Sequence, residues 1–402
     1  MKGTFAFIWM AFSSVFFMET AASNIENVEY DETCKVKKNV LLEKSDLMSL
    51  PIRQIVDKLY PDGNVFIGMA NHAKEIGKLS TEIADREFSY VTPSNDFKQS
   101  YIHRDLKKNN WRWINPDAYI KHSKEVGQVL RIHGPISPQC SPWVKNDIRT
   151  SEELEQMLEE YMTALCLRYG KEKNVKWMDV VNETICHENF AGGKGYNDMK
   201  PGDWFGPREG TTKWENPWTQ LGYDETSEIK VPVYIDKAFE IANRCAPNVK
   251  QIINQQGKFE EEVWEKMKKL VVYLRDVKGR RVDGLGWQCH IDMGWEKIPG
   301  NLERLDEMVK WCHENNLEFH ITEMNVWMKK TIDEDAQADT FGKILNVLLD
   351  NKETGVVGLS FWNVRDEDTA NPEWNGTLWK NDGTSRKAYD RVKKELIENA
   401  VQ

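Results

Sequence analysis

The chain has 402 residues, of which 40% are hydrophobic and 29% charged, a composition that is ordinary for a soluble globular protein. The formal net charge is −10 and no basic cluster stands out, which argues against a nucleic-acid partner and against binding to an anionic membrane surface. The unusual feature is the presence of 16 tryptophans, whose flat faces suit both cores and ligand platforms.

The N-terminus has the pattern of a secretory signal peptide. Lys2 precedes an apolar run that ends at Met18, and a cluster of small residues follows. The run is too short for a comfortable membrane span, and an interfacial anchor is the alternative. We therefore expect a secreted, monomeric protein without a membrane partner. Its expected parts are a signal peptide (1–23), an N-terminal extension (24–60) and one catalytic domain (61–402).

Eight short apolar runs predict buried strands. They cover residues 65–69, 88–92, 128–132, 177–181, 251–253, 284–287, 318–322 and 357–361. Patterns with helical spacing lie between them at 151–169, 233–246, 260–276, 301–315, 333–349 and 385–399. The first of these has Thr150 and Glu153 in the positions of a capping box. Alternating strands and helices imply a closed parallel (β/α)8 TIM barrel in the α/β class. An open doubly wound sheet is the alternative, but no G-x-G-x-x-G follows an early strand.

The longest connection, 187–229, follows the fourth predicted strand and is rich in glycine and aromatic residues. A loop of this length in a compact domain is usually functional, and in a barrel it lies on the face of the active site. The chain also has seven cysteines, none in a C-x-x-C pair, so a structural zinc site is not expected. Cys140 and Cys186 follow strands whose ends should be neighbours, and they are the expected disulfide pair.

Two glutamates close predicted strands that are buried. Glu183 follows the fourth strand and Glu323 the seventh. A carboxylate is costly to place at the mouth of a buried strand, and barrel strand ends project into one cleft. Both could then flank one glycosidic bond, one protonated to donate to the leaving oxygen and the other ionised to attack the anomeric carbon. The alternative is that each is a salt-bridged residue at the end of its strand.

Six motifs in the expected order carry a family resemblance. Segments 177–183, 284–290 and 321–325 resemble three signatures of the family 10 glycoside hydrolases, and segments 92–98, 131–133 and 361–366 resemble further strand motifs of that family. The resemblance covers the chain from about residue 65 onward. It implies a retaining endo-β-1,4-xylanase on a (β/α)8 barrel, acting on β-1,4-xylan or a related plant-type polysaccharide, with no cofactor and no metal.

The resemblance also implies roles for single residues. Glu183 would be the acid/base and Glu323 the nucleophile. Asn182 would bind the 2-hydroxyl of the sugar, while Gln288 and His290 would position Glu323. The remaining residues implied in substrate binding are Asn95, Lys98, His133, Trp362 and Trp374. The aromatic connection 187–229 would line the leaving-group side and favour polymers.

Three departures from the family pattern leave the substrate open, and a fourth concerns the pH optimum. Ser94 replaces the usual Glu, segment 134–140 is one residue shorter and has Ser137 but no aromatic residue, and Gln256 replaces Tyr. A retaining hydrolase of another β-1,4-glycan and a non-catalytic carbohydrate-binding barrel are therefore the alternatives. Asn325 replaces the usual Asp; it can bond to a histidine but cannot stabilise a positively charged one, so the pH optimum can differ from the family norm.

Overall fold

The computed structural model describes residues 44–104, 110–140, 150–188, 199–206 and 216–400. They belong to one compact unit that begins at Glu43. The expected signal peptide lies outside the described residues. Two short helices, α1 (Lys44–Ser49) and α2 (Ile52–Leu59), come from the expected extension and belong to this unit. Ile52 and Ile55 of α2 are fully buried.

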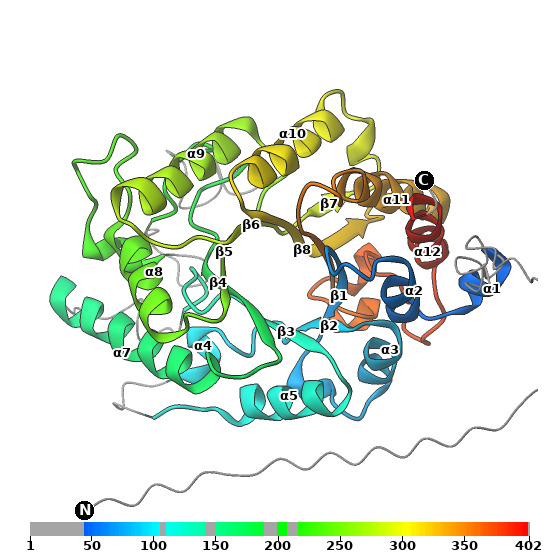
Figure 1. Ribbon diagram of the computed structural model, residues 1–402, viewed down its shortest axis with the longest axis horizontal. Coiled ribbons are helices and arrows are strands. Elements are labelled where there is room, and N and C mark those ends of the chain that lie inside the picture. Colours follow the sequence, from blue (N-terminus) through cyan, green and yellow to red (C-terminus); the bar gives the residue numbers. More distant parts are fainter. Residues whose placement is uncertain (1–43, 105–109, 141–149, 189–198, 207–215, 401–402) are drawn as a thin grey trace, which may run out of the picture. The chain divides into compact units, whose positions relative to one another are not determined.

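In the described part of the chain, eight parallel strands close into a barrel (Figure 1). They are β1 (Val65–Ala70), β2 (Tyr90–Thr92), β3 (Val129–Ile132), β4 (Val175–Asn182), β5 (Lys250–Gln255), β6 (Gly284–Trp287), β8 (Glu318–Trp327) and β9 (Val357–Trp362). Each strand pairs with its neighbour in chain order, β6 pairs with β8, and β9 pairs with β1 to close the ring. The predicted (β/α)8 TIM barrel is confirmed, and each of the eight predicted apolar runs overlaps one barrel strand.

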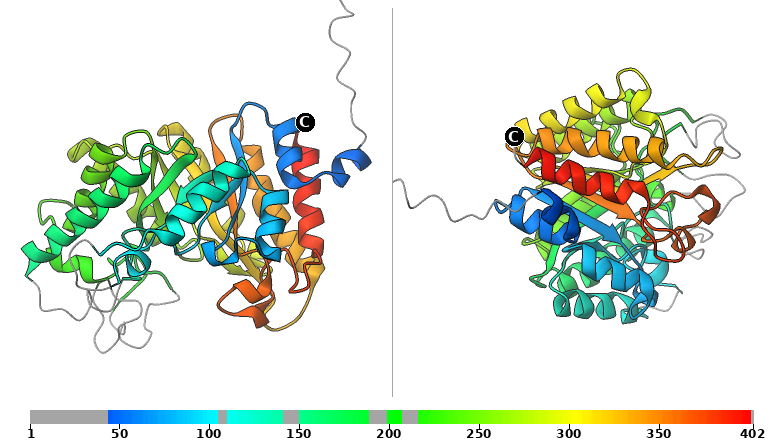
Figure 2. Two further views of the ribbon diagram at one scale, coloured as in Figure 1. Left: turned by 90° about the horizontal axis from the view of Figure 1, so that it is seen from below. Right: turned by 90° about the vertical axis from the view of Figure 1, so that its right-hand side faces the viewer.

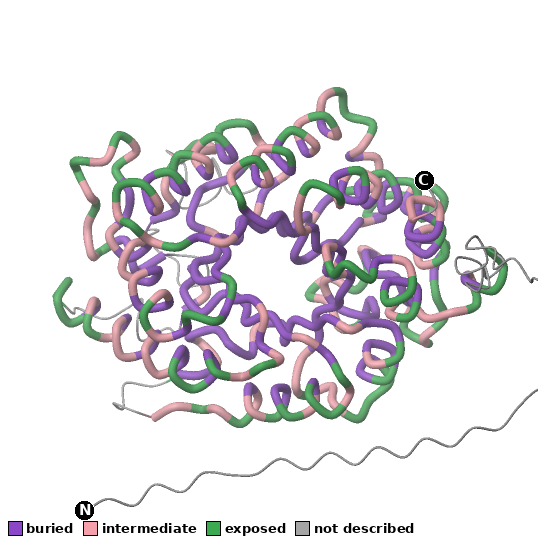
Figure 3. The backbone as a smooth tube through the Cα atoms, viewed as in Figure 1, coloured by how far each residue is buried: buried purple, intermediate pink, exposed green. Residues whose placement is uncertain are grey.

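A helix follows each barrel strand along the chain and packs outside it (Figures 1 and 2). These helices are α3 (Leu79–Glu87), α5 (Ile114–Glu125), α7 (Ser151–Tyr169), α8 (Val233–Cys245), α9 (Glu261–Val272), α10 (Asn301–Glu314), α11 (Glu334–Asp350) and α12 (Lys387–Asn399). The predicted capping box of α7 is confirmed, because Thr150 Oγ1 accepts from the Glu153 amide and Glu153 Oε2 accepts from the Thr150 amide. Figure 3 shows buried residues along the strands and the inner helix faces.

Shorter elements decorate the loops. They are α4 (Gln99–Ile102), a π-helical turn η4 (Tyr273–Val277) that continues α9, and five 3₁₀ turns: η2 (Ala73–Glu75), η3 (Pro217–Leu221), η5 (Trp295–Lys297), η6 (Asp366–Asp368) and η7 (Pro372–Trp374). A ninth strand, β7 (His290–Asp292), pairs in parallel with the end of β8, beyond the barrel itself. It extends the sheet above the barrel mouth, on the side where the strands end.

Large polar and aromatic side chains fill the barrel interior, and glycines make room for them. Trp177 is fully buried, and its indole nitrogen donates to Glu318 Oε2 at 2.7 Å. A Cβ atom at Gly68 would lie 2.3 Å from the Tyr90 ring, so only glycine fits there. The interior is therefore a packed core rather than a channel, which gives the strand ends a rigid base.

Candidate active site

The candidate site lies where the barrel strands end. Asn182 is the last residue of β4, and Glu183 follows it with a positive φ of 58°. Ser94, Cys289 and Asn363 follow the ends of β2, β6 and β9 and also have positive φ values. A residue with a side chain adopts this conformation only where its surroundings enforce it, and such positions cluster at functional sites.

A bridge of amide side chains joins the two glutamates. Gln288 Nε2 donates to Glu183 Oε1 at 2.8 Å and to Asn182 Oδ1 at 3.1 Å. Asn254 Nδ2 donates to the same Asn182 oxygen at 2.8 Å and to Glu323 Oε1 at 2.8 Å. Four hydrogen bonds thus connect the carboxylates of β4 and β8 through one shared acceptor atom. Both predicted glutamates lie in one polar cluster.

Glu323 is buried among donors and cations. Its Oε1 accepts from Asn254 and lies 3.6 Å from His133 Nε2, while its Oε2 lies 3.3 Å from His290 Nε2. Burial by itself opposes ionisation, but the charges of His133, His290 and Lys98 and the hydrogen bond to His290 outweigh it, and they lower the pKa of Glu323 to about 2. The group is therefore an ionised carboxylate at any ordinary working pH, as a nucleophile must be.

Each of the two histidines beside Glu323 has a hydrogen-bond partner at its Nδ1 atom, on the side of the ring away from the carboxylate. Nδ1 of His133 donates to Asp179 Oδ2 at 3.0 Å, and Arg131 Nη1 donates to the other Asp179 oxygen at 2.5 Å. Nδ1 of His290 lies 3.0 Å from Asn325 Oδ1. Such supporting bonds fix the ring orientation, so that each Nε2 atom points at the carboxylate.

Several predicted sugar-binding atoms are buried without a protein partner among the described residues. They include Asn182 Nδ2 and Asn95 Oδ1, which leaves both atoms for a ligand. The side chains of Lys98 and Asn182 both lie close to Gly134, where a Cβ atom would be 3.1 Å from Lys98 Cε and 3.5 Å from Asn182 Cβ. Lys98 Nζ donates to Gln139 at 2.8 Å. The Trp362 ring packs edge-on against both histidines, with centroid separations of 5.2 and 6.3 Å.

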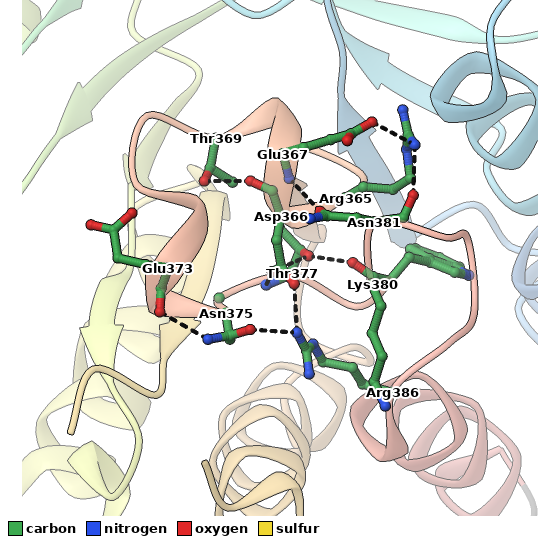
Figure 4. Close-up of polar contacts among 12 residues, drawn as sticks. Arg365, Asp366, Glu367, Thr369, Glu373, Asn375, Thr377, Lys380, Asn381 and Arg386 are labelled. Atoms are coloured by element: carbon green, nitrogen blue, oxygen red, sulfur yellow. Dashed lines mark hydrogen bonds and ion pairs between the residues drawn. The ribbon is translucent and has the colours of Figure 1, made fainter. Parts of the chain in front are cut away.

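Trp374 is carried by the loop 363–386, which follows β9. Figure 4 shows the polar network that holds this loop. Asp366 Oδ1 accepts from Thr377 Oγ1 at 2.8 Å, and Arg386 bonds both Asp366 and Asn375. Asp366, Thr377 and Arg386 are all buried. The loop is thus a fixed support. It places the Trp374 ring against the indole of Trp327, which in turn lies beside His290.

Two expectations are wrong in detail. Gln288 does not position Glu323; its amide donates to Glu183 and Asn182, on the other side of the amide bridge. Cys140 and Cys186 form no disulfide. The Cys140 thiol donates to the Ser137 carbonyl at 2.9 Å instead.

The expected place of the aromatic connection 187–229 on the leaving-group side stays a prediction. Phe205 and Trp218 are buried in the core, and Trp204 donates its indole N–H to the Ile229 carbonyl at 2.7 Å. Residues 189–198 and 207–215 of this connection lie outside the described residues.

Sequence reasoning missed two residues that contact the site directly. Asn254 binds Glu323, and Asp179 orients His133. Asn254 is next to the last residue of β5, so the rule that singled out the glutamates at strand ends could have found it. Asp179 is a charged residue inside the apolar run of β4, a position that a carboxylate occupies only with partners.

Among the described residues, no group of three or more His, Cys, Asp or Glu side chains could hold a metal ion. None of the helices that the structure describes is both long and apolar enough to cross a bilayer.

Comparison with known proteins places the chain in a family. The model of glycosyl hydrolase family 10 matches residues 56–395, which include every residue of the site described above. The chain belongs to glycosyl hydrolase family 10. It is therefore a glycoside hydrolase by family. In this family 10 chain Glu183 directly follows β4, as expected, whereas Glu323, which was expected to close its strand, lies inside β8, because that strand continues to Trp327.

Named relatives of this family 10 chain are xylanases. Endo-1,4-beta-xylanase B of Thermotoga neapolitana is 25% identical over 341 residues, covering 79% of this chain and 82% of the relative. Endo-1,4-beta-xylanase B of Neocallimastix patriciarum is 26% identical over 310 residues, covering 76% of this chain. This chain spans only 31% of that longer protein. Xylanase 10B of Thermotoga petrophila RKU-1, solved in complex with xylobiose, shares the fold with a TM-score of 0.68 and 24% identity over 87% of this chain and 98% of the other.

Proposed function

We propose that this family 10 chain is a retaining endo-β-1,4-xylanase that cleaves internal bonds of xylan. The observation that carries the proposal is the pairing of an ionised, buried Glu323 with Glu183 across one amide bridge. The xylanase names of its relatives support the substrate. Two carboxyl groups in different environments are what acid-assisted displacement at a sugar carbon requires.

The proposed first step forms a glycosyl-enzyme. Protonated Glu183 donates its proton to the glycosidic oxygen as the bond between that oxygen and the anomeric carbon breaks. Glu323 forms a covalent bond to the same carbon from the opposite face. Gln288 donates to Glu183 Oε1, so that oxygen acts as an acceptor and Oε2 carries the acid proton.

The second step releases the sugar. Glu183, now a carboxylate, accepts a proton from a water molecule whose oxygen attacks the anomeric carbon, and the bond to Glu323 breaks. Two inversions at one carbon leave its configuration unchanged. Asn182 Nδ2, which has no partner among the described side chains, donates to the sugar 2-hydroxyl next to the nucleophile.

Another β-1,4-glycan is the second candidate substrate, because the expected glycone side departs from the family pattern. Ser94 Oγ lies 3.1 Å from His72 Nε2, and Ser137 Oγ is buried without a partner among the described residues. Small hydroxyl side chains at both positions change which sugar groups can be bound.

Products from xylan, a soluble cellulose derivative and mannan test the proposal. We expect xylan to give short xylooligosaccharides at the highest initial rate, with the β-anomer appearing first in NMR spectra of fresh product. Faster cleavage of either other glycan would favour the second candidate. An α-anomer formed first would exclude retention, and binding to xylan without new reducing ends would indicate a non-catalytic barrel.

Export is a separate proposal, supported by the apolar run and the small residues before residue 24. The mature chain is expected to begin after Ala22 or Ser23 and to migrate as a monomer in size-exclusion chromatography. N-terminal sequencing of protein recovered from a culture medium checks the cleavage site, and an uncleaved chain held in the cells would contradict export.

A further inference from the structure

Trp327, the last residue of β8, stacks on a histidine that contacts the nucleophile. β7 pairs with the end of β8 so that His290 lies opposite Asn325 and Asp292 lies opposite Trp327. The His290 and Trp327 rings are almost parallel, with an interplanar angle of 3° and centroids 5.9 Å apart. The backbone pairing holds this arrangement in place.

The hydrogen bonds of Asn325 determine where His290 carries its first proton. Asn325 Nδ2 lies 2.8 Å from the Trp362 carbonyl oxygen and 3.4 Å from that of Gly376, and only a donor suits two acceptors. The Asn325 carbonyl oxygen therefore faces His290 Nδ1, at 3.0 Å. An oxygen can only accept, so Nδ1 carries a hydrogen.

The other ring nitrogen faces the nucleophile. His290 Nε2 lies 3.3 Å from Glu323 Oε2, and the proposed role of Glu323 as nucleophile requires it to be ionised. A lone pair at Nε2 would point at a negative oxygen. His290 can donate to Glu323 only if Nε2 also carries a proton, which makes the ring a cation. Among the described residues, His290 is the polar partner of Glu323 Oε2, since Asn254 binds Oε1.

Few groups can stabilise that cation. Within the described residues, Glu323 is the one anion paired with it, and Asn325 is neutral. His187 also interacts with His290, but burial above all, together with the positive charges of His290 and Lys258, lowers the pKa of His187 to about 4, so it adds no charge at neutral pH.

Two further positive charges act on Glu323, those of His133, which directly follows β3, and of Lys98 on the loop after β2. Both oppose a positive charge on His290 rather than support it. Glu183, the other carboxyl group of the site, accepts a hydrogen bond from Gln288 instead. Among the described residues, the remaining attractions for this cation are therefore the stacked indole face of Trp327 and the Trp362 ring, which lies at 80° to the imidazole.

Lys329 lies against the same indole, but an ion pair with Asp292 compensates its positive charge. Its Nζ is 3.9 Å from the Trp327 ring centroid and 4.5 Å from that of Trp374, and it pairs with Asp292 at 3.0 Å. Trp374 packs edge-on against Trp327, with centroids 4.9 Å apart. The ion pair with Asp292 offsets the charge of Lys329, so the indole remains available to His290.

We propose that Trp327 is a positioning residue that acts through His290: its indole face stabilises the doubly protonated imidazole that aligns Glu323, where position 325 supplies no charge. This rests on the proposed function, in which Glu323 is the nucleophile. Aromatic faces attract cations within about 6 Å of the ring centre. The attraction favours the charged ring, and with it the donor that Glu323 needs.

A purely structural role for Trp327 predicts a different result. A Cβ atom at Gly376 would lie 2.6 Å from the Trp327 ring, and the Met328 amide donates to the Trp374 carbonyl at 2.8 Å, so the indole is also a packed wall. If the indole only packs against its neighbours, its removal lowers kcat/KM by the same factor at every pH. Losing the support of a cation moves the alkaline limb of the pH profile.

The test is the pH dependence of kcat/KM on an activated aryl β-xylobioside. Its leaving group needs little protonation, so the acid Glu183 drops out of the first step. Trp327→Leu is expected to move the alkaline limb down by about one pH unit. Trp327→Phe keeps an aromatic face and should stay close to the unsubstituted enzyme.

Asn325→Asp supplies the missing charge and completes the test. Asn325→Asp should move the alkaline limb to higher pH. In the double variant with Trp327→Leu it should return the limb to its position in the unsubstituted enzyme. The rate itself should fall in both variants, because the hydrogen bond from Asn325 to the Trp362 carbonyl is lost. A loss by the same factor at every pH in Trp327→Leu, with no shift from Asn325→Asp, would overturn the proposal.

A second measurement does not depend on turnover. Spectra of ¹⁵N-histidine-labelled enzyme report which ring nitrogens carry protons, and His290→Gln assigns the signal. We expect protons at both His290 nitrogens at pH 6 in the unsubstituted enzyme and in Trp327→Phe. A singly protonated His290 at that pH would overturn the proposal even if Trp327→Leu failed to fold. An enzyme with this signal but no xylan cleavage would instead reject the proposed function.

Discussion

Glu323→Ala is expected to abolish the hydrolysis of every glycan, with a loss on the order of 10⁴ to 10⁶ in kcat. The alanine has no oxygen to bond to the anomeric carbon, so the glycosyl-enzyme cannot form. Asn254 and His290 also lose the carboxylate that they face. Initial rates of reducing-end release from xylan measure the loss, and activated aryl glycosides should be equally inert because the missing bond belongs to the first step.

A matched variant separates chemistry from folding in that experiment. Glu373 lies on η7, beside the site, and is exposed. Glu373→Ala should keep near-normal rates on xylan. Glu323→Gln preserves the size of the side chain and its place among the donors, so it should fold normally and remain inactive. Near-normal turnover in Glu323→Ala would remove the nucleophile assignment.

The barrel could be predicted because its strands are buried on both faces. A parallel strand covered by helices outside and packed side chains inside appears as a continuous apolar run, and each of the eight runs became a strand. β7 was not predictable in this way. Its three residues are half-buried, buried and exposed in turn, and it forms only because β8 continues to Trp327, five residues beyond the predicted run.

Those site residues could be predicted whose place near the end of a barrel strand is enough to direct the side chain into the site. Glu183 directly follows β4, and Glu323 follows the predicted run 318–322 but lies inside the longer β8. Both reach the place where the carboxyl ends of the barrel strands meet. The partner of Gln288 could not be predicted, because its amide lies between the two glutamates and its rotamer decides which one it meets. The Cys140–Cys186 pairing failed for a similar reason, since neighbouring strand ends do not fix the direction of each Cβ atom.

Glu183→Ala is expected to lower kcat on xylan by about 10² to 10⁴, the usual contribution of a general acid. The loss should depend on the substrate. A glycan leaving group needs the proton, whereas an activated aryl leaving group departs without it, so Glu323 still forms the glycosyl-enzyme. Hydrolysis of that intermediate then becomes slow, because no carboxylate at position 183 takes the proton from the attacking water.

Stopped-flow release of the aglycone measures this difference. Glu183→Ala should show a burst close to one equivalent of enzyme, followed by a slow steady state, while xylan cleavage is almost lost. Glu188→Ala is the matched control: its side chain lies five residues further along the same loop, paired with Lys258 at the surface, and its variant should show neither effect. If the aryl glycoside lost its burst as completely as xylan lost cleavage, Glu183 would serve both leaving groups equally. A proton donor cannot do that, so the acid role would pass to another group.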